Sequence, residues 1–419
     1  MINIKKTTKE RICNGCGVCS VVCPKLAIEV SLNDKKGSYG PEIINDKCDS
    51  CGICLKVCPA MGLNSQNNNL LGNYIASFVG FANNEEIRYN ASSGGAITAL
   101  LVFALEKGLI NGAVVTRFAK DNILTAESFI ARTKEEIIAA SQSKYCPVAM
   151  DTILKEIISS AKSERLAFVG LPCQISAIRE ASKINIELRK KIVFYVGLFC
   201  GFRPNFNGLK FFLEKNNINK EEIKEINYRG SGWPGFVKIL KKNGEVVNFS
   251  FPSYWSVAGS SFFYPKSCMA CTDCTSERAD LSFGDAWLKE FKDDKIGHSI
   301  IICRTEKGNT LLGDAKEAGI LKFEKIPYKK VIQSQIINIY LKKKGLRALF
   351  PKKKLQGLEP DLLDSVLSLF FLFNSIIGEK KISRKFLSFI PLRIISLYTG
   401  FLGKFWRYKA ERGFKEYIN

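Results

Sequence analysis

The sequence reads CNGCGVCSVVCP over residues 13–24 and CDSCGICLKVCP over residues 48–59. Both segments follow the pattern C-x2-C-x2-C-x3-C-P, so this part of the chain is an internal duplication. In this pattern three thiolates surround one iron–sulfur cubane, and the fourth reaches across to a second cubane. The spacing therefore predicts two [4Fe–4S] clusters, whose ligands are Cys13, Cys16, Cys19 and Cys58 for one and Cys48, Cys51, Cys54 and Cys23 for the other.

The glycines between these cysteines support the same interpretation. Gly15, Gly17 and Gly52 stand where the backbone must turn tightly and direct N–H groups at sulfide. A pair of zinc knuckles is the alternative, but zinc sites rarely need eight interleaved cysteines. Over residues 8–62 the segment resembles a bacterial two-cluster ferredoxin, which implies a small α+β domain that conducts electrons.

The composition of the whole chain narrows its class. With 419 residues and 46% hydrophobic residues, the chain is long and apolar enough for two or three globular domains, which excludes a disordered or collagen-like protein. Fifteen cysteines, one histidine and an N-terminus without an apolar signal segment indicate metal ligation in the cytoplasm rather than disulfides. No apolar run is long enough to predict a transmembrane helix.

A polar stretch at residues 64–69 predicts a linker, and a second pattern begins after it. Apolar runs at residues 112–118, 165–171 and 191–200 predict buried strands, which alternate with predicted helices at residues 96–107, 134–141, 151–161 and 174–181. This alternation predicts an α/β domain with a mixed or partly parallel sheet. We therefore expect a ferredoxin-like domain over residues 1–63, an α/β domain over residues 72–340 and a helical extension over residues 341–419.

Several short motifs in the middle of the chain carry polar or thiol groups. The segment SSGGA at residues 92–96 precedes a predicted helix and can cradle a phosphate through backbone N–H groups, although an ordinary serine-capped helix is the alternative. Cys173 and Cys200 follow predicted strands, and three more cysteines follow at residues 268, 271 and 274. Together they can form a third cluster, but Cys173 and Cys200 can equally be packing thiols, as we expect for Cys146 and Cys303.

Taken together, these motifs resemble one family, the beta subunits of coenzyme F420 (deazaflavin) reducing hydrogenases and dehydrogenases. The motifs are SSGGA (92–96), SKY (143–145), GLPCQ (170–174), FC (199–200), YRG (228–230), CMAC (268–271) and ADLSFGDAW (279–287). The resemblance covers roughly residues 72–340 and implies an iron–sulfur flavoprotein with FAD beside a third [4Fe–4S] cluster. It implies that Cys173, Cys200, Cys268 and Cys271 hold this cluster, with Cys274 as an extra that can substitute for one of them.

The resemblance also implies a flavin site. Its predicted residues are Ser92, Ser93, Gly94, Gly95, Lys144 and Tyr145, and the lysine would stabilise the anionic reduced flavin by charge pairing. The resemblance does not fix the substrate, since other relatives reduce different acceptors. Many are encoded among polysaccharide-biosynthesis genes, so a role in polysaccharide biosynthesis is a further expectation.

The last 78 residues form a basic extension outside the resemblance. From Lys342 onward there are 17 Lys and Arg against 6 Asp and Glu, which is +11 of the chain's +22. Aromatic and aliphatic residues alternate with these charges, a pattern typical of a helix at an anionic membrane surface. The alternatives are helices that pack on the α/β domain or dock a partner subunit; nucleic-acid binding is not expected. Because every proposed ligand precedes Lys342, we expect the clusters to survive deletion of residues 342–419.

These expectations combine into an oxidoreductase. Electrons would pass between the ferredoxin clusters, the third cluster and FAD, and from there to or from a small-molecule acceptor. The alternative is an electron-transfer subunit without a substrate of its own, which serves a separate catalytic partner. Either function requires a redox partner protein or ferredoxin, and the basic extension predicts a location at or near the inner face of the membrane.

Overall fold

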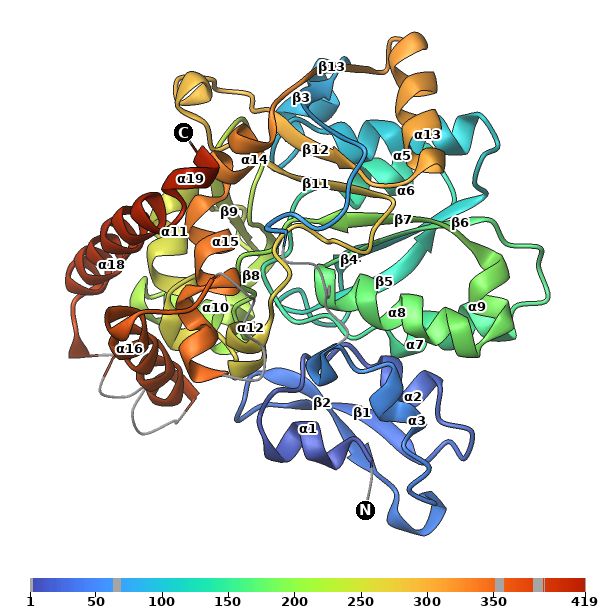
Figure 1. The fold of residues 1–419 in the computed structure, drawn as a ribbon, viewed down its shortest axis with the longest axis horizontal. Coiled ribbons are helices and arrows are strands. Elements are labelled where there is room, and N and C mark those ends of the chain that lie inside the picture. The colour runs from blue at the N-terminus through green and yellow to red at the C-terminus, as the bar shows by residue number, and fades with distance from the viewer. Residues whose placement is uncertain (1–2, 63–68, 351–357, 380–386, 388, 419) are drawn as a thin grey trace.

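The computed structural model describes residues 3–62, 69–350, 358–379, 387 and 389–418. The predicted linker at residues 64–69 therefore lies outside the described residues, except for its last position. In the N-terminal unit, strands β1 (Ile28–Asn33) and β2 (Ser38–Ile43) form an antiparallel pair. Around this pair lie the short helices α1 (Lys5–Lys9), α2 (Val18–Val21) and α3 (Ile53–Lys56). The two cysteine motifs surround α2 and α3, as Figure 1 shows at the bottom of the molecule.

The centre of the molecule is an eight-stranded mixed sheet. Its order is β13-β3-β12-β11-β7-β6-β4-β5. The four strands β11, β7, β6 and β4 run parallel, and the strands outside them are antiparallel. The strands are β3 (Ala76–Ala82), β4 (Gly112–Phe118), β5 (Ala126–Ala131), β6 (Leu166–Gly170), β7 (Ile192–Leu198), β11 (Leu281–Asp285), β12 (Ser299–Cys303) and β13 (Leu321–Lys325). The predicted mixed sheet is confirmed.

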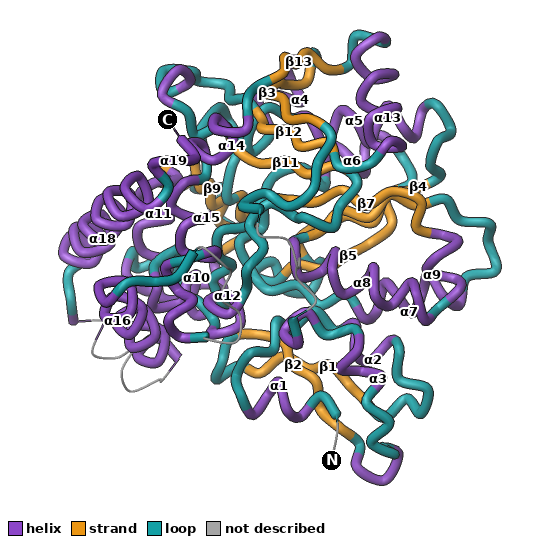
Figure 2. Tube along the Cα trace, in the orientation of Figure 1, coloured by secondary structure: helices purple, strands orange, loops and turns teal. Residues whose placement is uncertain are grey.

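Helices cover both faces of this sheet (Figure 1), and Figure 2 shows its strands between the helical layers. One face carries α5 (Ala96–Glu106), α6 (Lys134–Ala139) and α13 (Glu306–Glu317), and the other carries α7 (Asp151–Ser159), α8 (Pro172–Ile184) and α9 (Ile186–Lys191). The three predicted strands and four predicted helices are confirmed with small shifts at their ends. Helix α6 begins at a capping box between Thr133 and Glu136, and Pro172 occupies the first turn of α8.

The N-terminal unit packs against the second of these helical faces. Val18 and Val57 belong to the same apolar cluster as Leu154 of α7 and Ile178 of α8. All four side chains are almost completely removed from solvent. Burial of this apolar surface stabilises the attachment, so the two cysteine motifs are fixed beside the carboxyl ends of the parallel strands.

A second sheet lies beside the first and is antiparallel. It consists of β8 (Ile223–Asn227), β9 (Phe236–Lys241) and β10 (Val246–Ser250) in the order β10-β9-β8. Helices α10 (Phe206–Lys215) and α11 (Phe251–Ala258) pack on it around an aromatic cluster that includes Phe212, Tyr228 and Tyr254. Two further short helices are α4 (Glu85–Asn90), before α5, and α12 (Lys266–Ala270), which carries Cys268.

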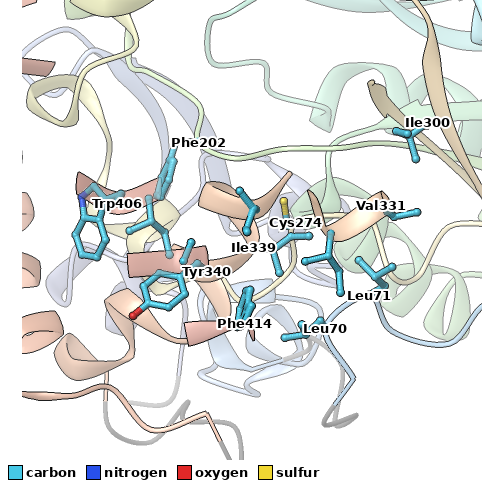
Figure 3. Packing of buried hydrophobic residues seen from close by; sticks show 14 of the residues in the cluster. Leu70, Leu71, Phe202, Cys274, Ile300, Val331, Ile339, Tyr340, Trp406 and Phe414 are labelled. Carbon is cyan, nitrogen blue, oxygen red and sulfur yellow. The ribbon is translucent and has the colours of Figure 1, made fainter. Parts of the chain in front are cut away.

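The C-terminal helices lie along one side of the molecule. They are α14 (Tyr328–Ser334), α15 (Ile336–Lys343), α16 (Leu362–Glu379), α18 (Leu392–Gly413) and α19 (Lys415–Ile418). Figure 3 shows Tyr340 of α15, Trp406 of α18 and Phe414, which follows α18, in one cluster with Leu70 and Phe202 from earlier in the chain. Helix α15 runs across the predicted boundary at residues 340 and 341. No helix among the described residues is long and apolar enough to cross a bilayer.

Candidate functional site

The two cysteine motifs bring their thiols into the groups that the spacing predicts. Burial, together with the nearby thiols of Cys16, Cys13, Cys58 and Cys54, raises the pKa of Cys19 well above its ordinary value. Burial and the Cys16 and Cys13 thiols also raise the pKa of Cys58 to about 12. Cys13, Cys16, Cys19 and Cys58 thus lie close enough to interact, and we call them the first thiol group.

The second thiol group consists of Cys23, Cys48, Cys51 and Cys54. All four line one small cavity of about 20 Å³. Gly52, which also lines it, has a φ of +76° and begins α3, just as Gly17 has a φ of +79° and begins α2. These left-handed conformations favour glycine, which explains the repeated glycine in both motifs. The Cys54 thiol is near Cys19 as well as Cys23 and Cys51, so the two groups adjoin.

A third thiol group is assembled from distant parts of the sequence. Cys173 opens α8, Cys200 follows β7, Cys268 lies in α12 and Cys271 follows it. Burial raises the pKa of Cys173, and the thiols of Cys271, Cys16, Cys200 and Cys268 raise it further. Because Cys16 belongs to the first group, the three groups follow one another from the N-terminal unit into the α/β domain.

The number and type of the donors in each group bear on the metal site that it would form. Among the described residues, no three His, Cys, Asp or Glu side chains come close enough together to hold one ion. In a cubane each thiolate binds a different iron, so the ligands stand further apart than they do around zinc. Each group supplies four thiols, which is the donor set of a [4Fe–4S] cluster.

Cys274 occupies a different environment. Its side chain is completely buried in an apolar cluster, near Leu71 and Ile339 in Figure 3. Its carbonyl accepts a hydrogen bond from the Cys200 N–H at 2.8 Å, so the residue fixes the loop that carries Cys271. Cys303 is likewise buried in β12, and Cys146 is buried beside Phe206, as expected for packing thiols.

One cavity of about 810 Å³ lies next to the first and third thiol groups. Cys16, Cys173 and Cys200 line it, and so do most of the predicted flavin residues: Ser92, Ser93, Gly95, Lys144 and Tyr145. Gly94 does not line the cavity. A Cβ at Gly94 would come within 2.7 Å of the Gly80 carbonyl oxygen, so this glycine lets the loop approach β3 closely.

The start of α5 faces this cavity without a side-chain cap. The sequence predicts a serine cap, but the structure has Gly95 at that position because Ser92 and Ser93 are engaged elsewhere. Ser92 Oγ accepts the Ser143 N–H at 2.8 Å, and Ser93 Oγ lies 2.8 Å from Ser299 Oγ. Residues 96–98 line the cavity, so the positive end of an 11-residue helix is directed at it.

Arg229 forms hydrogen bonds with residues of several of the family motifs. This buried guanidinium donates to the Tyr145 hydroxyl at 2.9 Å, to Asp285 Oδ2 at 2.8 Å and to the Ser92 carbonyl. It also lies over the Phe251 ring, 4.2 Å from its centre. Motifs far apart in the sequence therefore converge on one side chain. The YRG motif signals Arg229 in the sequence, but sequence reasoning did not place it in the site.

Lys144 differs from its predicted role. The side chain lines the cavity, but its ammonium group donates to the carbonyls of Ala140, Ser141 and Gln142 at 2.7, 2.5 and 3.2 Å. Burial lowers the pKa of Lys144 to about 7, although the Cys146 thiol opposes this shift. The Lys144 charge is thus directed into the backbone rather than into the cavity.

Two other cations lie closer to the thiols. Arg203 lines the cavity and donates to the Asn14 carbonyl in the first cysteine motif at 3.2 Å, while its Nη1 has no hydrogen-bond partner among the described residues. Lys342 is 2% exposed, and its Nζ lies 3.4 Å from Cys271 Sγ and 2.9 Å from the Asp273 carbonyl. Burial alone would lower the pKa of Lys342, but the four surrounding thiols raise it.

The start of the extension is therefore part of the site. Besides Lys342, the buried Lys343 forms an ion pair with Glu277, and Arg347 donates to the Ala270 and Met269 carbonyls. These contacts hold the loop between Cys268 and Cys274. They argue against the expectation that deletion from Lys342 onward leaves the third thiol group intact.

The fold and the thiol groups define an iron–sulfur protein of the oxidoreductase class, and comparison with known proteins identifies the family. Residues 77–155 and 163–329 match the N-terminal and C-terminal regions of the coenzyme F420 hydrogenase/dehydrogenase beta subunit, and residues 12–61 match a 4Fe-4S dicluster domain. The chain belongs to the coenzyme F420 hydrogenase/dehydrogenase beta subunit family, as its motifs predict.

Several characterised relatives show how far the likeness extends. The chain is 29% identical to coenzyme F420 hydrogenase subunit beta of Methanococcus voltae, over 61% of this chain and 85% of the relative. It is 30% identical to the subunit of the same name from Methanothermobacter thermautotrophicus, over 60% of this chain and 83% of the relative. It is also similar in structure to a chain of the F420-reducing [NiFe] hydrogenase complex from Methanosarcina barkeri, with a TM-score of 0.51 and 26% identity. The match covers 65% of this chain and 89% of that chain.

Proposed function

We propose that this chain is an electron-transfer subunit that passes electrons between a redox partner protein and the 810 Å³ cavity. The observation that carries the proposal is the unbroken series of three thiol groups. Cys51 in the second group is exposed, whereas Cys173 in the third group is only partly exposed and lines the cavity. Electrons can therefore enter at the surface of the N-terminal unit and arrive beside the cavity.

The residues that would hold the clusters follow from these groups. The first two groups supply the ligands of the two N-terminal [4Fe–4S] clusters, and Cys173, Cys200, Cys268 and Cys271 supply those of the third. Cys274 is left out of this set because its side chain packs in an apolar cluster, although its thiol lies near Lys342 and Cys200. Arg203 contacts the loop of the first group and also lines the cavity, so it fixes the first group relative to the final acceptor site.

The cavity fits a flavin such as FAD. It has room for a large planar ligand, a helix N-terminus to attract its phosphates, and the unpartnered Arg203 nitrogen to balance its negative charge. When bound, a flavin would couple one-electron transfer to a two-electron reaction. Arg229 would position the flavin site by holding Tyr145 and the Ser92 backbone in place.

Reduction or oxidation of a small acceptor by this chain itself is a second candidate function. One observation favours it: the cavity continues to Thr399, Gly403 and Arg407 of α18, which lies outside the regions matched by the family. Because the cavity extends to the C-terminal helix α18, it has room for an acceptor beside the flavin. Coenzyme F420, after which the relatives are named, is the acceptor that we propose to test first.

Anaerobic reconstitution tests the series of clusters. Three cubanes predict about 12 irons per chain, and Cys173→Ala should lower the content by about four while sparing the N-terminal clusters. Cys303→Ala is the matched control, because it removes a buried thiol outside the three groups. A wild-type value of about eight irons would contradict the third cluster.

Rapid mixing with reduced ferredoxin tests the direction of the path. The wild-type chain should bleach its bound flavin quickly, and Cys51→Ala, which breaks the outermost group, should slow the bleaching at least tenfold. Equal rates in both proteins would show that electrons bypass the N-terminal unit. Bleaching of the flavin by a separate catalytic subunit but by no small molecule would favour the subunit function over the second candidate.

A further inference from the structure

The helices α16 and α18 each present an apolar stripe to the outside of the molecule. On α16 the exposed residues recur at helical spacing, and their side chains are 42–82% exposed: Leu362, Leu363, Val366, Leu369, Phe370 and Phe373. On α18 the exposed apolar residues are Ile394, Leu397, Phe401 and Tyr408, with Phe389 and Ile390 just before it. We call these residues together the apolar face. Large apolar patches on soluble proteins usually mark sites of interaction.

The opposite sides of both helices are anchored to the body of the protein. Phe371 of α16 and Trp406 of α18 are buried and contact each other edge to face. Asn374 Nδ2 donates to Ser261 Oγ at 2.9 Å, and Ser375 Oγ donates to the Tyr264 carbonyl at 2.7 Å. The inner sides are therefore satisfied by packing within the chain, and the apolar face is left over by the fold.

The two helices lie side by side and antiparallel. Near the end of α16, Asn374 donates to the Tyr398 hydroxyl in the first turns of α18 at 2.8 Å. Near its start, Lys409 of α18 pairs with Asp361 and with Asp364, the latter at 3.6 Å. Figure 1 shows both helices on the same side of the molecule. The two helices that carry the stripes are therefore held next to each other.

Exposed basic residues accompany the apolar face. Arg393, Lys404, Arg412 and Lys415 are exposed on or beside α18. Lys404 lies three residues after Phe401 and four before Tyr408, so it shares their side of the helix. Positive charge therefore lies next to the apolar side chains.

We propose that this surface docks the chain onto an anionic lipid bilayer, with the apolar face inserted at the headgroup boundary. Charge complementarity favours this occupant, since lysine and arginine beside an apolar stripe attract anionic headgroups. A protein partner usually needs polar groups to fix its orientation, about one hydrogen bond per 100–200 Å². Apart from the Tyr408 hydroxyl, the side chains of the apolar face offer no such group, whereas fluid acyl chains require none.

Docking would bring the bilayer close to the redox site. The inner side of α18 lines the large cavity through Thr399, Gly403 and Arg407, while the outer side carries Leu397 and Phe401. One helix thus separates the cavity from the docked surface. This arrangement does not depend on which cofactor the cavity holds, so the docking proposal stands apart from the proposed function.

Vesicle flotation of the full-length, cofactor-loaded protein tests the proposal. The wild-type chain should float with vesicles of phosphatidylglycerol and phosphatidylcholine at low salt and should bind pure phosphatidylcholine at least tenfold more weakly. Leu369→Gln, Phe370→Gln and Phe401→Gln combined should abolish flotation with both lipids. Arg393→Gln, Lys404→Gln and Lys415→Gln combined should remove the preference for the anionic lipid.

A matched control keeps the result specific. Leu26→Gln combined with Val246→Gln changes apolar residues that are 69% and 44% exposed elsewhere on the molecule, and this variant should float like the wild type. Iron and flavin contents should be equal in all variants, because every substituted side chain is exposed. Wild-type protein that ignores anionic vesicles would overturn the proposal. Sedimentation velocity gives a second outcome that would overturn the proposal. If the wild type is a dimer and only the apolar-face variant is a monomer, the face joins two copies of the chain.

Discussion

Replacement of Lys342 by methionine should lower the reduction potential of the third cluster. The Lys342 ammonium lies 3.4 Å from Cys271 Sγ and is almost completely buried, so little water screens its charge. An added electron makes a cluster more negative, and a nearby cation stabilises that reduced state. Lys342→Met keeps the length and apolar stem of the side chain but removes the charge, so the reduced state should become harder to form.

The size of this shift follows from the distance. At an effective dielectric constant of about 20, two unit charges 3.4 Å apart interact by about 5 kcal/mol. Since 59 mV corresponds to a tenfold change for one electron, that energy equals roughly 200 mV. The electron is shared over the whole cluster rather than held on one sulfur, so we expect a decrease on the order of 100 mV.

Potentiometric titration followed by electron paramagnetic resonance measures this shift. The signal of the third cluster is assigned as the one that Cys173→Ala removes. Lys342→Arg should restore most of the potential because it returns the charge, and Lys162→Met, at an exposed position, should change nothing. A potential that moves by less than about 20 mV while the iron content stays complete would refute the electrostatic reasoning.

Three other substitutions test the site. Arg229→Met should destabilise the protein by about 3–5 kcal/mol in urea unfolding, since it leaves the Asp285 carboxylate without its buried partner. The double variant Arg229→Met, Asp285→Asn should recover part of this loss. Burial lowers the pKa of Lys144 to about 7, so above that pH the unfolded chain binds more protons than the folded chain does. The stability of the wild type relative to Lys144→Met should therefore rise between pH 7 and 10, by less than about 1.4 kcal/mol per pH unit. A stability difference that does not change with pH would contradict the low pKa. Gly94→Ala should lower the stability of the fold by about 1–3 kcal/mol, because the new Cβ would meet the backbone of β3 and β12. The control Gly400→Ala, which has open space around it, should be neutral or stabilising. Equal melting temperatures for the two variants would count against this packing.

The sequence predicts the N-terminal thiol groups because their geometry is local. Three ligands of each group, such as Cys48, Cys51 and Cys54, lie within one short loop and helix, so their spacing alone determines which thiols converge. The third group depends on long-range packing instead. Cys173 and Cys200 meet Cys268 only because β6 and β7 are parallel neighbours and end at the same edge of the sheet. Spacing could not predict that, and only the family resemblance pointed to it.

The polar network around the cavity was harder to predict for a related reason. A motif shows which residues matter but not where their side chains point. Lys144 was expected to face the flavin, yet its ammonium group is held by three backbone carbonyls, and the contacts to the motifs come from Arg229. Likewise the serines of the SSGGA segment bond to Ser143 and Ser299, which leaves Gly95 to start α5.

The basic extension shows why net charge is an incomplete guide. Its 17 basic residues predict a helix at a membrane surface, but three of them, Lys342, Lys343 and Arg347, are buried against the Cys268–Cys274 loop. Burial of a cation is costly unless it is paired, and here a thiol, the Glu277 carboxylate and backbone carbonyls supply the partners. The extension therefore has two physically distinct parts. Its first residues complete the redox site, and the proposed membrane docking depends on the charge that remains exposed beside the apolar face of α16 and α18.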